Sequence, residues 1–142
     1  MSLKLDHVGH VVENLEEGRK FYEERLGLAP KLIMSHPQFE SKMAFYPFAN
    51  IEIELIQPSR MPEDYARRCL KERGEGIFHL SFVPDDYDAE VKAWREKGFT
   101  VEEIVAEEAR GPVRLAFLKP EETWGVWIEF VDTTKLSVPP SK

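Results

Sequence analysis

The fold is decided by residues 3–12, LKLDHVGHVV, and by their counterpart at residues 76–83, GIFHLSFV. Both stretches are short and rich in apolar side chains, and the first is rich in valine, a pattern that predicts β-strands. Each carries a histidine near its middle, His7 or His79, and is followed by the same order of expected elements. The sequence therefore predicts two copies of one structural unit.

The first copy continues with a helix and three strands. Asn14 and Glu17 have the spacing of a helix-capping box, and Gly27 ends the helical pattern. Three segments typical of strands follow, at residues 31–35, 41–46 and 50–56.

The second copy repeats this order. Residues 84–86 supply a turn and a helix cap, and a helix is expected over residues 87–97 before Gly98. The expected strands of this copy are residues 100–105, 113–118 and 125–131. Between the copies, residues 62–73 predict a linker helix that ends at Gly74.

These elements predict an α+β fold in which two tandem βαβββ modules form a cupped, eight-stranded sheet. We expect a single domain over residues 1–132 and a loose tail over residues 133–142, where prolines are frequent and apolar residues few. Within the domain, the first module covers about 3–57, the linker helix about 60–74 and the second module about 75–132.

Composition excludes several classes of function. The net charge of −7 argues against nucleic acid as the main partner, because phosphate backbones are bound by clustered Lys and Arg. No apolar run approaches the roughly 20 residues that span a bilayer, and no signal-peptide core is visible, so we expect a cytoplasmic protein without membrane contact. The single cysteine, Cys69, excludes a disulfide within the chain and a cysteine-based zinc cluster.

Four side chains that can bind metal fall at equivalent places in the two copies. The first strand of each copy carries a histidine, His7 or His79, and the last strand carries a glutamate, Glu54 or Glu129. Glu54 shares its face with Glu52 and Ile56, and Glu129 shares its face with Trp127 and Val131, while the opposite face of each strand is wholly apolar. Two neutral imidazoles and two carboxylates form a suitable site for divalent Co, Ni, Mn, Zn or Fe. A lone histidine or glutamate in a strand is more often a surface residue. The prediction of a metal site therefore depends on the occurrence of both residue types at equivalent places in the two copies.

Four segments of the chain resemble the vicinal oxygen chelate superfamily, which includes glyoxalases, bleomycin resistance proteins and dioxygenases. Within that superfamily the chain is most similar to the methylmalonyl-CoA epimerase family, over about residues 4–131. The segments that carry the resemblance are DHVG at 6–9, ELIQP at 54–58, RGEGIFH at 73–79 and GVWIE at 125–129. The resemblance implies a metal held by His7, Glu54, His79 and Glu129, usually in a homodimer.

The chain departs from the epimerase pattern around its expected second base. Glu40 is the only carboxylate between Lys31 and Asn50, but Gln38 occupies the place that matches the catalytic glutamate of the family. Trp124 and Trp127 replace smaller residues beside the last strand, and we expect these two indoles to narrow the pocket.

The resemblance predicts a metal-dependent epimerase or isomerase that acts through an enolate on a small acyl thioester such as an acyl-CoA. Glu129 and Glu40 are the expected acid and base. One alternative is a lyase similar to glyoxalase I, acting on a glutathione thiohemiacetal. Another is a metal-free protein that binds a small molecule, such as a resistance protein. An extradiol dioxygenase is disfavoured, because that class uses two histidines and one glutamate and the carboxylate at position 54 adds a fourth ligand.

Three further side chains have simpler interpretations. His10 lies on the face opposite His7, so we expect it to pack against or cap a helix. Arg114 either holds a substrate carboxylate or is a surface arginine. Cys69 is expected to be a small core residue.

Overall fold

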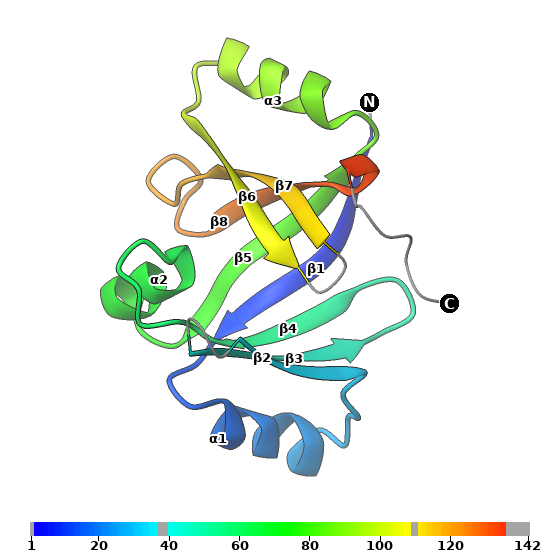
Figure 1. Ribbon diagram of the computed structural model, residues 1–142, viewed down its shortest axis with the longest axis vertical. Helices are drawn as coiled ribbons and strands as arrows, with labels where there is room; N and C mark the ends of the chain where they lie inside the picture. The colour runs from blue at the N-terminus through cyan, green and yellow to red at the C-terminus, as the bar shows by residue number, and fades with distance from the viewer. Residues whose placement is uncertain (1, 37–39, 109–110, 136–142) are drawn as a thin grey trace. The chain divides into compact units, whose positions relative to one another are not determined.

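A computed structural model describes residues 2–36, 40–108 and 111–135 (Figure 1). The described residues form eight strands and three α-helices, which confirms the α+β class and the two βαβββ modules. The chain divides into two compact units, one of residues 7–79 and one of residues 1–6 together with residues from Leu80 onward. Strands β1 (Leu3–Val11) and β5 (Gly76–Pro84) contribute residues to both units.

Within the unit of residues 7–79 the strands follow the order β2-β3-β4-β1-β5. The neighbouring pairs β2–β3 and β3–β4 are antiparallel, whereas β4 runs parallel to β1. The other three strands of this unit are β2 (Leu32–His36), β3 (Ser41–Pro47) and β4 (Glu52–Gln57).

The helix of this unit begins as the sequence predicts. Helix α1 (Leu15–Lys20) is capped by Asn14, whose side chain accepts a hydrogen bond from the Glu17 amide. It continues as one π-helical stretch, η1 (Phe21–Arg25), which the sequence pattern did not indicate. Gly27 then adopts a φ of 72°, a conformation that favours glycine.

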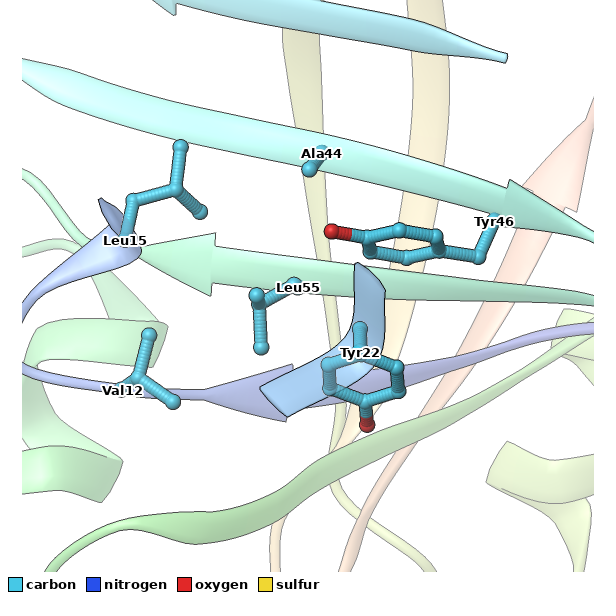
Figure 2. Close-up of a cluster of buried hydrophobic side chains, with 6 residues drawn as sticks. All are labelled: Val12, Leu15, Tyr22, Ala44, Tyr46 and Leu55. Atoms are coloured by element: carbon cyan, nitrogen blue, oxygen red, sulfur yellow. The ribbon is translucent and has the colours of Figure 1, made fainter. Parts of the chain in front are cut away.

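The hydrophobic core of this unit lies between α1, η1 and strands β3 and β4. Figure 2 shows six of its side chains: Val12, Leu15, Tyr22, Ala44, Tyr46 and Leu55. The rings of Tyr22 and Tyr46 stack with their centroids 4.9 Å apart. Burial of this apolar surface ties the helix to one face of the sheet and leaves the other face for polar side chains.

The linker helix also belongs to this unit. Helix α2 (Tyr65–Arg73) begins after Asp64, whose carboxylate accepts a hydrogen bond from the Ala66 amide, and ends at Gly74. It is therefore shorter than the predicted segment, because the capping carboxylate lies two residues after Pro62. Cys69 is buried in this helix, which confirms its assignment as a core residue.

The second unit has the strand order β1-β5-β8-β7-β6. Asp86 caps helix α3 (Tyr87–Glu96) by accepting a hydrogen bond from the Ala89 amide, and α3 packs on β6 and β8. The strands of this unit are β6 (Val101–Glu108), β7 (Gly111–Leu118) and β8 (Trp127–Asp132). A 3-10 turn, η2 (Thr133–Lys135), follows β8, and the rest of the predicted tail lies outside the described residues. Among the helices of the described ranges, none has the length and apolar content needed to cross a membrane.

Candidate metal centre

Three of the four predicted ligands converge within the unit of residues 7–79. The Nε2 atom of His7 lies 3.0 Å from Nε2 of His79 and 3.1 Å from Oε2 of Glu54. The candidate ligand atoms of the three residues all lie within 4.8 Å of one another. His7 is 8% exposed and His79 is 4% exposed, so this His–Glu–His cluster is shielded from bulk water.

The parallel pairing of β1 and β4 brings His7 and Glu54 together. Gly9 of β1 is the direct neighbour of Glu54 in the ladder, which places the glutamate two residues along from His7. Leu55, the next residue of β4, is fully buried in the core beneath α1. Because side chains alternate along a strand, Glu54 points to the face opposite that core.

The imidazole of His79 packs directly against the backbone of β1 at Gly9. A Cβ atom built on Gly9 would lie 2.8 Å from both Cδ2 and Nε2 of the His79 ring. Such a distance is shorter than non-bonded carbon and nitrogen atoms tolerate, so only glycine accommodates the ring in this position. A glycine inside a strand often marks a close approach of another group, but the pattern alone does not identify that group as His79.

The three residues fit a divalent transition-metal ion. Ligands about 2.0–2.2 Å from such an ion are about 3.0–3.5 Å apart in octahedral or tetrahedral geometry. The separations of 3.0 and 3.1 Å among the His7, His79 and Glu54 atoms agree with that range. Two imidazole nitrogens and one carboxylate oxygen are also the donor set that these ions prefer. The predicted metal centre is thus supported at three of its four residues.

Glu129, the fourth predicted ligand, belongs to the second unit. It is 4% exposed, and its Oε1 atom accepts a hydrogen bond of 2.6 Å from the Ser81 hydroxyl. This short, charge-assisted bond orients a buried carboxylate. The role of Glu129 as a metal ligand and as a catalytic group stays a prediction.

Glu40, the expected second base, lies at the surface of the unit of residues 7–79. It has a φ of 58°, and its carboxylate forms an ion pair with Arg60, with Nε 3.0 Å from Oε2. Glu40 and Arg60 both line a cleft of about 590 Å³ that the sequence did not indicate. The catalytic role of Glu40 stays a prediction, and Gln38 lies outside the described residues.

Two other predictions, on His10 and Arg114, have definite outcomes. Nδ1 of His10 lies 2.7 Å from the hydroxyl of Tyr22 in η1, which confirms a helix-packing role. Arg114 is hydrogen-bonded to Asp132 and Asp88, and its guanidinium lies over the ring of Tyr87. Its carboxylate partners thus come from the protein itself.

The two tryptophans differ in exposure. Trp124 is 95% exposed, so the prediction that it narrows a pocket is wrong. It follows the turn that begins at Pro120 and adopts a φ of 57°, which carries its side chain into solvent. Trp127 is buried and meets the ring of Phe117 edge-on.

Comparison with known proteins places these features in a family. Residues 6–117 match the model of the Glyoxalase/Bleomycin resistance protein/Dioxygenase superfamily. The uncharacterized protein YqjC of Bacillus subtilis (strain 168) is 26% identical, over 91% of this chain and 91% of its own length. Human mitochondrial methylmalonyl-CoA epimerase is 28% identical, over 89% of this chain and 72% of its own length.

A solved structure agrees with both sequence comparisons. A variant of Streptomyces coelicolor methylmalonyl-CoA epimerase, in complex with 2-nitronate-propionyl-CoA, superposes with a TM-score of 0.74 at 25% identity. The match covers 92% of this chain and 97% of that one. With the βαβββ modules and the His–Glu–His cluster in place, the family match over most of the chain is decisive: the protein belongs to the Glyoxalase/Bleomycin resistance protein/Dioxygenase superfamily.

Proposed function

We propose that this protein is a metal-dependent epimerase that acts through an enolate on a small acyl-CoA thioester, in the manner of methylmalonyl-CoA epimerase. The observation that carries the proposal is the convergence of His7, Glu54 and His79 on one point. The similarity to methylmalonyl-CoA epimerases of human and Streptomyces coelicolor supports the choice of reaction.

The proposed ligands are His7, Glu54, His79 and Glu129, with Co, Ni, Mn, Zn or Fe as the candidate ions. Both imidazoles must be unprotonated at Nε2 to offer a lone pair to the ion, so each neutral ring carries its proton on Nδ1. The two carboxylates balance the charge of a divalent ion, which lowers the cost of burying them. A bound ion would polarise the thioester carbonyl and stabilise the negative charge that develops when an α-proton leaves.

The proton transfers are assigned to Glu129 and Glu40. One carboxylate takes the α-proton from one side of the substrate, and the other, in its protonated form, returns a proton to the opposite side. The α-carbon is thereby inverted without net change in protonation once the two groups re-equilibrate with solvent. Ser81 supports this assignment for Glu129, because its hydroxyl donates a hydrogen bond to Oε1 and orients the carboxylate.

Exchange of the α-proton with solvent tests the proposal. Metal-loaded protein in D₂O should introduce deuterium at the α-carbon of methylmalonyl-CoA faster than the metal alone, and Glu129→Gln should abolish the enhancement. Exchange no faster than with free metal would contradict the proposal. Turnover of the methylglyoxal–glutathione adduct in place of exchange would instead favour a lyase similar to glyoxalase I. Light scattering in solution checks the homodimer that we propose alongside this activity.

A further inference from the structure

A cleft of about 590 Å³ lies in the unit of residues 7–79. Its basic lining residues are Lys42, Arg60 and Arg67, and its acidic ones are Glu13 and Glu40. The lining therefore has a formal charge of +1 in a chain whose net charge is −7. A cleft of this size accommodates a small molecule, and its charge favours an anion.

Arg67 is held in a fixed orientation at the cleft. Its Nε atom donates to the Ser59 carbonyl at 2.6 Å, and its Nη2 atom donates to the Pro58 carbonyl at 3.0 Å. A guanidinium has five N–H donors, so these two bonds leave three for a ligand. A cation that is already immobilised loses little entropy when it binds an anion.

Lys42 differs from its counterpart in the second module. In the β3–β4 ladder Phe45 is opposite Glu54. Three residues earlier in β3, Lys42 is opposite Gln57. In the β7–β8 ladder Phe117 is opposite Glu129, and the same step leads to Arg114 opposite Asp132. The second module thus neutralises its cation with an aspartate, whereas the first module places a neutral amide opposite an exposed lysine.

Gln57 has a second feature that suits an anion. Its Oε1 atom accepts a hydrogen bond of 2.9 Å from the Leu15 amide at the start of α1. With the oxygen occupied, the side chain offers its NH₂ group to other partners. Ser35 and Ser41, which also line the cleft, add two hydroxyl donors.

From these contacts we infer that the cleft is a binding site for phosphate groups, with Lys42, Arg60 and Arg67 as the cations. The phosphates come either from the coenzyme A part of a thioester or from a free diphosphate. The first source rests on the proposed function, whereas affinity for phosphate does not. Glu40 opposes binding, because its carboxylate is ion-paired with Arg60. If the phosphates come from coenzyme A, the pantetheine arm separates them from the α-carbon, so a base other than Glu40 then serves the second proton transfer.

Calorimetric titration with inorganic pyrophosphate and with coenzyme A tests the site. The full-length protein is used in EDTA, both as wild type and as His79→Ala, so that pyrophosphate cannot act through a bound metal. Both proteins should bind with affinity that falls as salt is raised. Lys42→Gln combined with Arg60→Gln should weaken binding at least about tenfold, as expected for loss of charge-assisted hydrogen bonds.

Two further variants make the test specific. Gln57→Glu keeps the acceptor for the Leu15 amide but adds a negative charge opposite Lys42, so binding should weaken without a change in shape. Glu40→Gln releases Arg60 and should tighten binding about two- to fivefold. Lys71→Gln combined with Arg73→Gln removes the same charge from exposed positions of α2 outside the cleft lining, and should change affinity less than about twofold.

The outcomes separate this inference from the proposed function. Absence of saturable binding by both probes, or equal weakening in the two double variants, would overturn it even if metal and exchange activity are present. Tighter binding of coenzyme A, in competition with pyrophosphate, identifies the coenzyme as the source. Equal or tighter binding of pyrophosphate identifies a free diphosphate, and the site then stands even if the epimerase assay fails.

Discussion

Gly9 and Ser81 occupy equivalent places in the two modules, each two residues after the histidine of its first strand. At Gly9 the absent side chain leaves room for the ring of His79, which lies 2.8 Å from the position that a Cβ atom would take. At Ser81 the side chain donates a 2.6 Å hydrogen bond to Glu129. The same backbone position therefore positions a histidine in one unit and a carboxylate in the other.

This difference shows how a repeated scaffold gives an asymmetric site. Each module carries a histidine in its first strand and a glutamate in its last strand, but the residues around them have separate tasks. Within residues 7–79 the absence of a side chain at Gly9 makes room for the His79 ring. Within the second unit the Ser81 hydroxyl donates a hydrogen bond to a buried carboxylate. Substitutions at the two positions should therefore fail in different ways.

The largest expected effect is loss of metal from His79→Ala. The variant removes one of the three converging ligand atoms, so metal content measured by elemental analysis should fall from about one ion per chain to background. His10→Gln is the matched control, because His10 is a histidine of the same unit that contacts Tyr22 instead of the cluster. Equal metal content in wild type and His79→Ala would refute the centre.

Gly9→Ala should weaken metal binding without removing a ligand. The added methyl group would lie 2.8 Å from the His79 ring and force the imidazole away from His7 and Glu54. Displacing a ligand in this way costs roughly 10–100-fold in metal affinity. Competition with a chromogenic chelator measures the change.

Gly9→Ser sharpens the same comparison by making the two modules alike at this position. Its larger side chain should weaken metal binding at least as much as alanine does, although serine is native at the equivalent place. Affinity within about twofold of wild type for both variants would show that the ring moves freely and that Gly9 does not position it.

Ser81→Ala should lower the free energy of unfolding of the metal-free protein. Removal of the hydroxyl leaves the buried Glu129 carboxylate without this donor, which costs about 1–3 kcal/mol of unfolding free energy. Urea unfolding of the metal-free protein measures the loss. Ser59→Ala is the control, since that buried hydroxyl accepts a hydrogen bond from the neutral Met61 amide and its loss should cost less. A larger loss for Ser59→Ala would contradict the role given to Ser81.

Much of the fold follows from local signals in the sequence. Asn14 and Asp86 cap the helices as predicted, because a capping side chain and the amide it binds lie within a few residues. His7, Glu54 and His79 are predictable as a group, because the alternation of side chains in a strand and the repeat of the two modules can both be read from the sequence. The π-helical turn of η1 was missed, since its hydrogen-bonding pattern depends on packing and not on composition.

The supporting residues of the sites were harder to predict for the same reason. Gly9, Ser81 and Arg67 act through partners that lie 70, 48 and 8 to 9 residues away. Their roles depend on strand pairing and loop geometry, which spacing alone does not specify. Trp124 shows the opposite error: its position beside β8 indicated a pocket, but a single left-handed residue turns it to solvent.

The Arg114–Asp132 pair should give the smallest effect, and one that depends on pH. Burial raises the pKa of Asp132, but hydrogen bonds from Thr134 and Arg114 outweigh it and hold the pKa below the ordinary value of 3.8. A carboxyl whose pKa is lower in the folded state stabilises the protein above its unfolded pKa and loses that contribution as pH falls through the folded value.

Asp132→Asn should therefore lower the unfolding free energy by about 1–2 kcal/mol at neutral pH, and the difference from wild type should shrink below about pH 4. Urea unfolding at several pH values measures both quantities. Glu52→Gln, which removes the exposed ion pair with Lys31, is the control and should change stability by less than about 1 kcal/mol. A difference that grows on acidification would show that Asp132 is not the ionised partner of Arg114, and the contrast with Lys42 and Gln57 would lose its electrostatic basis.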